Sequence, residues 1–157
     1  MSLFNNPSDR QVNLGLTILR LVVGAIFIAH GGQKLFVFGL DGVTAGFTQM
    51  GMPMAGLLAP LVAFVELFGG IALIAGLLTR LAAFGLATTM LVAILKVHLP
   101  AGFFNPAGIE FPLSLLGSSL LLVLTGAGKL SIDSLIASRT SKVTPAVLRD
   151  ERIRRAA

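Results

Sequence analysis

Residues 26–35 read IFIAHGGQKL and close a long apolar run that begins near Leu14. Three polar side chains, His30, Gln33 and Lys34, follow one another there at i, i+3 and i+4. In a helix this spacing places all three on one face. Ionisable side chains inside an apolar helix are costly in a membrane, so they mark a functional site or a paired polar core. The stretch therefore predicts a membrane-spanning helix with a polar face near one end.

The composition of the whole chain places this helix in lipid. Of the 157 residues, 55% are hydrophobic and only 12% are charged, and the mean hydropathy is +0.90. Soluble domains carry about 25% charged residues. The sequence contains no cysteine, which excludes disulfides, thiolate metal sites and thiol redox chemistry within the chain. We therefore expect an integral membrane protein whose first partner is the lipid bilayer.

Four hydrophobic runs approach the length that is needed to cross roughly 30 Å of hydrocarbon. They cover about residues 14–36, 56–78, 81–99 and 111–127. Helices are expected because open strands cannot satisfy their backbone groups in lipid. We predict an all-α fold, an integral membrane four-helix bundle over residues 13–133. A polar N-terminal lead (1–12) precedes it and a basic cytoplasmic tail (134–157) follows it.

The basic residues predict the orientation of the bundle. Arg10 precedes the first run and Arg80 lies between the second and third, whereas Lys34 and Lys96 lie toward the other side. Seven further basic residues follow the fourth run: Lys129, Arg139, Lys142, Arg149, Arg152, Arg154 and Arg155. The positive-inside rule then places both termini in the cytoplasm. The basic tail suits anionic lipid headgroups, and we expect no nucleic-acid partner.

Two patterns concern the surroundings of the helices. In the loop 37–53, Val43, Phe47 and Met50 recur at i, i+4 and i+7, which predicts a short amphipathic helix at the outer interface, either a connector or a lid.

Arg20 lies about 9 Å along the first helix, so we expect its long side chain to reach the headgroups.

Small residues predict where the helices pack closely. Ala25 and Ala29 form a small-xxx-small pair on the first helix, beside Gly24, Gly31 and Gly32, and the second helix carries Gly69, Gly70 and Gly76. We expect these positions to bring the two helix backbones together.

Seven polar side chains are expected to converge in the outer half of the bundle. They are His30, Gln33, Lys34, Glu66, Lys96, His98 and Glu110. Glu66 lies about 15 Å into the second helix, near the middle of the membrane. Burial at that depth favours the protonated form of Glu66, unless a cation such as Lys34, Lys96 or protonated His30 stabilises the ionised form.

These residues admit three functions from different classes. In a quinone-linked oxidoreductase subunit, Glu66 and His30 would be catalytic and handle protons, while Lys34, Gln33, Lys96, His98 and Glu110 would bind the substrate. In a small proton-coupled transporter or channel, the same groups would line a path. In a non-catalytic assembly protein, Glu66 and its partner would only fix the helix register. A metal site is not expected, because the histidines and glutamates come from four elements without a short ligand motif.

Four motifs in order resemble the DoxX family of small bacterial membrane proteins. They are His30-Gly31-Gly32-Gln33-Lys34-Leu35, Glu66-Leu67-Phe68-Gly69-Gly70 with Gly76 to Arg80, Glu110-Phe111-Pro112, and Gly126 to Asp133. The resemblance covers roughly residues 15–133. It implies a multi-pass four-helix protein of the bacterial inner membrane. Some members are associated with a thiosulfate:quinone oxidoreductase and others with redox-stress complexes, so it implies a soluble or membrane redox partner and a quinone as ligand. A homo-oligomer is expected only for the transporter, because four short helices are a small frame for alternating access.

Overall fold

The computed structural model describes residues 6–140, and these residues are all-α. Three helical stretches are long and apolar enough to cross a membrane, Asp9–Val37, Ala55–Ala75 and Thr79–Ala101, and Glu110–Thr125 is a shorter apolar helix. The elements are α1 (Asp9–Gly32), η1 (Gln33–Val37), α2 (Gly39–Gln49), α3 (Ala55–Ala75), α4 (Thr79–Ala93), η2 (Ile94–His98), η3 (Leu99–Ala101) and α5 (Glu110–Thr125). A further helix begins at Ile132 and continues to Thr140.

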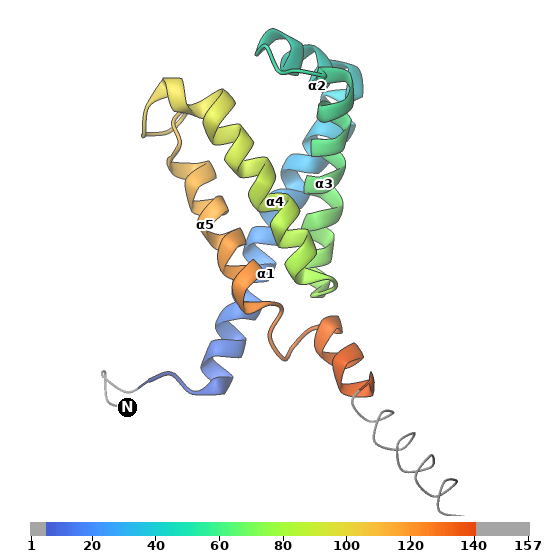
Figure 1. The fold of residues 1–157 in the computed structure, drawn as a ribbon, viewed down its shortest axis with the longest axis vertical. Coiled ribbons are helices and arrows are strands. Elements are labelled where there is room, and N and C mark those ends of the chain that lie inside the picture. Colours follow the sequence, from blue (N-terminus) through green and yellow to red (C-terminus); the bar gives the residue numbers. More distant parts are fainter. Residues whose placement is uncertain (1–5, 141–157) are drawn as a thin grey trace, which may run out of the picture.

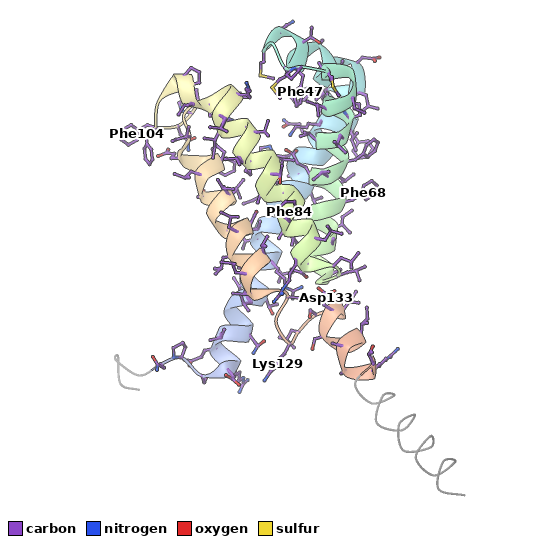
Figure 2. All side chains as sticks on the ribbon, in the orientation of Figure 1. Phe47, Phe68, Phe84, Phe104, Lys129 and Asp133 are labelled. Atoms are coloured by element: carbon purple, nitrogen blue, oxygen red, sulfur yellow. The ribbon has the colours of Figure 1, made fainter. Side chains whose placement is uncertain are left out.

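The helices form two pairs that meet through α3 and α4. α1 packs against α3, and α4 packs along α5, as Figure 1 shows. α2 lies over the end of α1 and α3, and the α4–α5 loop lies at this same end, which we call the α2 end. The start of α1 and the helix after α5 lie at the opposite end, which we call the Asp133 end (Figures 1 and 2).

Local sequence explains where the helices begin and end. α1 begins at Asp9, earlier than the apolar run, because Ser8 and Gln11 form a capping box. The predicted lead 1–12 is therefore partly helical, and its residues 1–5 lie outside the described part. α3 ends where Gly76 adopts a left-handed conformation with φ +65° and Leu77 N–H donates to the Ala72 carbonyl at 3.0 Å. The amphipathic helix predicted in the loop 37–53 is confirmed as α2.

Glycines let the α1 and α3 backbones touch. A Cβ atom added to Gly24 would lie 2.7 Å from the Gly70 carbonyl oxygen, and one added to Gly31 would meet the Leu67 backbone. The predicted close packing is therefore present at Gly24 and Gly31. The part of the prediction that rests on Ala25 and Ala29 was wrong, because these two residues are exposed. Small residues lie on more than one face of this helix, and only the packing of α3 decides which of them are covered.

The large exposed side chains agree with a lipid surround. Phe68 on α3 and Phe84 on α4 are 60% and 61% exposed and point away from the bundle (Figure 2). The buried core between the pairs includes Phe27, Leu73 and Leu86.

The expectation that Arg20 reaches the headgroups is wrong. Its side chain is only 1% exposed. Nη1 donates to the Leu73 carbonyl at 3.1 Å, and Nη2 donates to the Leu130 carbonyl at 2.6 Å. The segment after α5 folds back under the bundle and supplies the second carbonyl, which no local pattern around Arg20 could indicate.

Asp133 ties that segment to the turn between α3 and α4. Its carboxylate accepts hydrogen bonds from the N–H groups of Leu78 at 2.7 Å and Thr79 at 2.9 Å, so it caps α4 from 54 residues further along the chain. Its own N–H donates to the Gly76 carbonyl at 2.9 Å. Burial by itself would raise the pKa of Asp133. The hydrogen bonds from Thr79 and Leu78, together with the nearby Arg20 guanidinium, outweigh it and hold the pKa below its ordinary value.

The predicted cytoplasmic tail is described only in part. Residues 134–140 continue the helix that begins at Ile132, and Ser131 caps it by accepting from the Ser134 N–H at 3.2 Å. Residues 141–157 lie outside the described part of the chain, so most of the basic tail stays a prediction.

Replacing Gly24 by alanine should destabilise the protein by about 1–3 kcal/mol, because the new methyl group would overlap the Gly70 carbonyl. Unfolding of the purified protein in mixed micelles, titrated with SDS, measures the effect. Gly15→Ala is the matched control, because it lies in the same helix with nothing within 4 Å of the added Cβ. Equal losses from both variants would contradict the packing role of Gly24.

Replacing Asp133 by alanine should cost about 1 kcal/mol at pH 7, the typical value for a lost helix cap. The folded-state pKa of Asp133 lies below the unfolded-state value, so the ionised carboxylate stabilises the fold above about pH 4. That contribution is lost as the pH falls through the folded-state pKa. The difference in unfolding free energy between wild type and variant should therefore shrink at pH 3, and a difference that grows in acid would contradict this assignment.

Candidate functional site

A cavity of about 390 Å³ opens at the α2 end, between the α1–α3 pair and the α4–α5 pair. Its polar lining consists of His30, Lys34, Glu66, Thr89 and His98. Its apolar lining includes Phe27, Phe47, Met50, Met52, Met90, Phe111 and Leu115. A mostly apolar cavity with a few convergent polar groups is the usual form of a small-molecule site.

The centre of the polar lining is an ion pair between η1, the continuation of α1, and α3. Lys34 Nζ donates to Glu66 Oε2, and the side chains are 21% and 4% exposed. Glu66 is thus held by one of the three cations expected as its partner. The close approach at Gly31, whose missing Cβ would meet Leu67, brings the two helices together beside this pair.

A π-helical turn follows both α1 and α4 at this end of the bundle. η1 contains Lys34, and η2 contains Lys96 and His98. Such wide turns change the direction of the side chains that follow and occur often at functional sites. They explain why a strict 3.6-residue spacing does not predict which of these side chains line the cavity.

The two histidines line the cavity from different walls. His30, on α1, lies with its ring centroid 6.0 Å from that of Phe111 on α5. His98, at the end of η2, has its Nδ1 atom 2.7 Å from the Ala107 carbonyl oxygen.

Three of the seven residues that were expected to converge lie outside the cavity lining. Gln33 and Lys96 are exposed. Glu110 accepts a hydrogen bond from the Asn105 N–H at 2.8 Å, so it shapes the α4–α5 loop. Among residues 6–140, no group of three histidine, aspartate or glutamate side chains could hold a metal ion.

Sequence reasoning missed several residues of the lining. Thr89, Met52 and Phe111 line the cavity but carried no site signal. Phe47 and Met50 belong to the apolar pattern that predicted a helix in residues 37–53, and both line this cavity.

The order of motifs agrees with the comparison to known proteins. A family profile described as DoxX matches residues 15–99, more than half of the chain. The chain belongs to the DoxX family. No solved structure matches it significantly.

Three curated relatives extend the match over most of the DoxX chain. The protein named "Putative oxidoreductase CatD" of Bacillus subtilis (strain 168) is 34% identical over 128 residues, 82% of this chain and 91% of the relative. Inner membrane protein YqjF of Escherichia coli (strain K12) is 34% identical over 125 residues, which are 79% of this chain and 93% of the relative. Inner membrane protein YphA of the same strain is 32% identical over 124 residues, which are 75% of this chain and 87% of the relative. This DoxX protein is accordingly an inner-membrane protein.

Replacing Lys34 by methionine should cost about 3–5 kcal/mol, because it leaves the Glu66 carboxylate buried without a partner. Replacing both residues, Lys34→Met with Glu66→Leu, should recover most of that loss, since an apolar pair of similar volume removes the buried charge. SDS-titrated unfolding of the two variants measures the difference. If the single and the double variant were equally unstable, the unpaired charge of Glu66 would not be the cause of the lost unfolding free energy.

Proposed function

We propose that this DoxX protein is a component of a membrane redox system, and that its cavity binds a flat apolar ring bearing carbonyl oxygens, the chemistry of a quinone. The observation that carries the proposal is the Lys34–Glu66 pair, set in a wall of an otherwise mostly apolar cavity. The apolar side chains suit the ring, and the ion pair suits an oxygen that gains negative charge when the ring is reduced.

The polar residues then have distinct roles in our proposal. Lys34 stabilises the negative charge that forms on a quinone oxygen during reduction. Glu66 and His30 give and take the protons that accompany the electrons. Gln33, Lys96 and Glu110 are left out of the proposed site because they lie outside the lining.

The electrons have to come from elsewhere than the side chains of this chain. The sequence contains no cysteine, tyrosine or tryptophan, the residues that most often carry electrons in proteins. A bound cofactor or a redox partner, soluble or membrane-bound, is therefore part of the proposal. The name of the Bacillus relative, an oxidoreductase, supports the same class of function.

Charge supports an outward-facing site. Arg10, Arg80, Lys129 and Arg139 lie toward the Asp133 end, whereas Lys34 and Lys96 lie toward the α2 end. By the positive-inside rule we propose that the Asp133 end faces the cytoplasm and that the cavity opens toward the outer side.

The packing favours a binding site over a transport path. Phe27 lines the cavity and is also part of the packed core with Leu73 and Leu122, which are fully buried. A transport path would have to pass through this core. An assembly protein without catalysis needs no cavity around its ion pair, and the ligand experiment below tests that alternative.

Lys34→Met should weaken the binding of 1,4-naphthoquinone about tenfold or more, the value of a lost hydrogen bond to a charged group. The chain lacks tryptophan and tyrosine, so the near-ultraviolet absorbance of the probe can be followed in detergent without protein background. Lys96→Met is the matched control, because Lys96 is exposed outside the cavity.

The double variant Lys34→Met with Glu66→Leu guards against loss of folding, and it should also bind weakly. If the wild type fails to bind the probe, or if both lysine variants bind it equally well, the proposed function is wrong.

A further inference from the structure

The ring of His98 is held by the backbone of the α4–α5 loop. Its Nδ1 atom lies 2.7 Å from the Ala107 carbonyl oxygen. A carbonyl oxygen only accepts hydrogen bonds, so Nδ1 must carry the proton. In the neutral ring the other nitrogen, Nε2, is then a proton acceptor.

The loop that carries the Ala107 carbonyl is fixed from several sides. The Ile109 N–H donates to the Gly102 carbonyl at 3.0 Å, and the Glu110 N–H donates to the Phe103 carbonyl at 2.9 Å. The Glu110 side chain accepts from the Asn105 N–H at 2.8 Å. The position of the carbonyl, and with it the tautomer of His98, is therefore built into the fold.

Nε2 is the nitrogen of His98 that remains for a ligand. His98 is partly buried and lines the cavity from η2, whereas Lys34 and Glu66 line it from η1 and α3. The other titratable groups on the cavity are His30, Lys34 and Glu66, and Lys96 is exposed two residues before His98. For His30, no hydrogen bond among the described residues fixes the tautomer.

We propose that His98 is the proton acceptor for a ring hydroxyl of the reduced ligand, and that the Ala107 carbonyl orients it for this task. The inference rests on the proposed function and names the reduced, dihydroxy ring as a ligand in its own right. In the step, the ligand O–H bond breaks, its electron pair stays on the oxygen, and a new Nε2–H bond forms. The Ala107 carbonyl then accepts from Nδ1–H of the imidazolium and stabilises its charge.

The arrangement gives the ligand two polar anchor points. One oxygen of the ring meets the Lys34–Glu66 pair, and a second oxygen meets His98 on the facing wall. Oxidation of the dihydroxy ring to the quinone removes two electrons, which pass to the redox partner as the electron acceptor, and two protons. One proton goes to His98 Nε2 and the other to the Glu66 carboxylate, and both then leave to the water at the α2 end. In the reverse direction the imidazolium returns the proton to a reduced oxygen.

The histidine content makes the tautomer directly measurable. The sequence has only two histidines, His30 and His98, so ¹⁵N-histidine labelling gives two ring systems in an NMR spectrum, and His98→Asn assigns them. In the free protein we expect His98 with Nδ1 protonated and Nε2 unprotonated. A free protein with the proton on Nε2 alone would overturn the inference.

Binding of two matched probes tests the proton transfer. Under anaerobic conditions the wild type should bind 1,4-dihydroxynaphthalene about tenfold more tightly than 1,4-dimethoxynaphthalene, which has no hydroxyl proton. His98→Asn keeps a donor for the Ala107 carbonyl but has no ring nitrogen to accept a proton, so the preference should fall several-fold, and only the part that comes from the Glu66 carboxylate should remain. The Nε2 signal of wild-type His98 should shift toward the protonated form with the dihydroxy probe only.

The outcomes separate this inference from the proposed function. If 1,4-naphthoquinone binds in a Lys34-dependent way while His98→Asn retains the full preference for the dihydroxy probe, only the role of His98 is overturned. If neither naphthoquinone nor its reduced form binds to the wild type, the proposed function is overturned and this inference falls with it.

Discussion

The structure depends on one buried ion pair between two helices. Glu66 is 3% exposed in the middle of an apolar helix, and a charge there requires a partner because burial among apolar side chains disfavours an isolated charge. Lys34 is that partner, and glycines at positions 24, 31 and 70 let the α1 and α3 backbones come close enough for the two side chains to meet. The cavity forms around this pair, where the α4–α5 pair and α2 close over it.

Polar contacts at the opposite end hold the remaining elements in register. Arg20 reaches carbonyls of α3 and of the segment after α5, while Asp133 caps the first turn of α4. Together they connect α1, the α3–α4 turn and the segment after α5. The bundle is thus fixed at one end by backbone-directed hydrogen bonds and at the other by an ion pair. The cavity lined by His30, Lys34, Glu66 and His98 lies at the second end, and these are the side chains that the proposed function uses.

The proposed chemistry uses two features of the cavity, the ion pair on one wall and the loop carbonyl that holds His98. The ion pair supplies charge at one wall of the cavity, and the loop carbonyl that holds His98 sets which of its nitrogens accepts a proton. Neither supplies electrons, so the proposed function requires a redox partner. The DoxX family and the inner-membrane relatives establish what kind of protein this is and where it lies, but a family does not by itself assign a reaction. The proposed function therefore rests on the residues that line the cavity.

The sequence by itself determined the class of the molecule and the identity of its polar centre. Three apolar runs long enough to cross a membrane, a shorter fourth, and the polar residues at i, i+3 and i+4 in the first run can all be recognised from the local sequence. His30, Lys34, Glu66 and His98 were all expected at one site, and the structure places them around one cavity. The tertiary structure alone decided that Arg20 is buried, that Gln33, Lys96 and Glu110 lie off the lining, and which face of α1 packs closely. Those outcomes depend on contacts between segments up to 110 residues apart and on two π-helical turns, and no periodicity within a single helix encodes them.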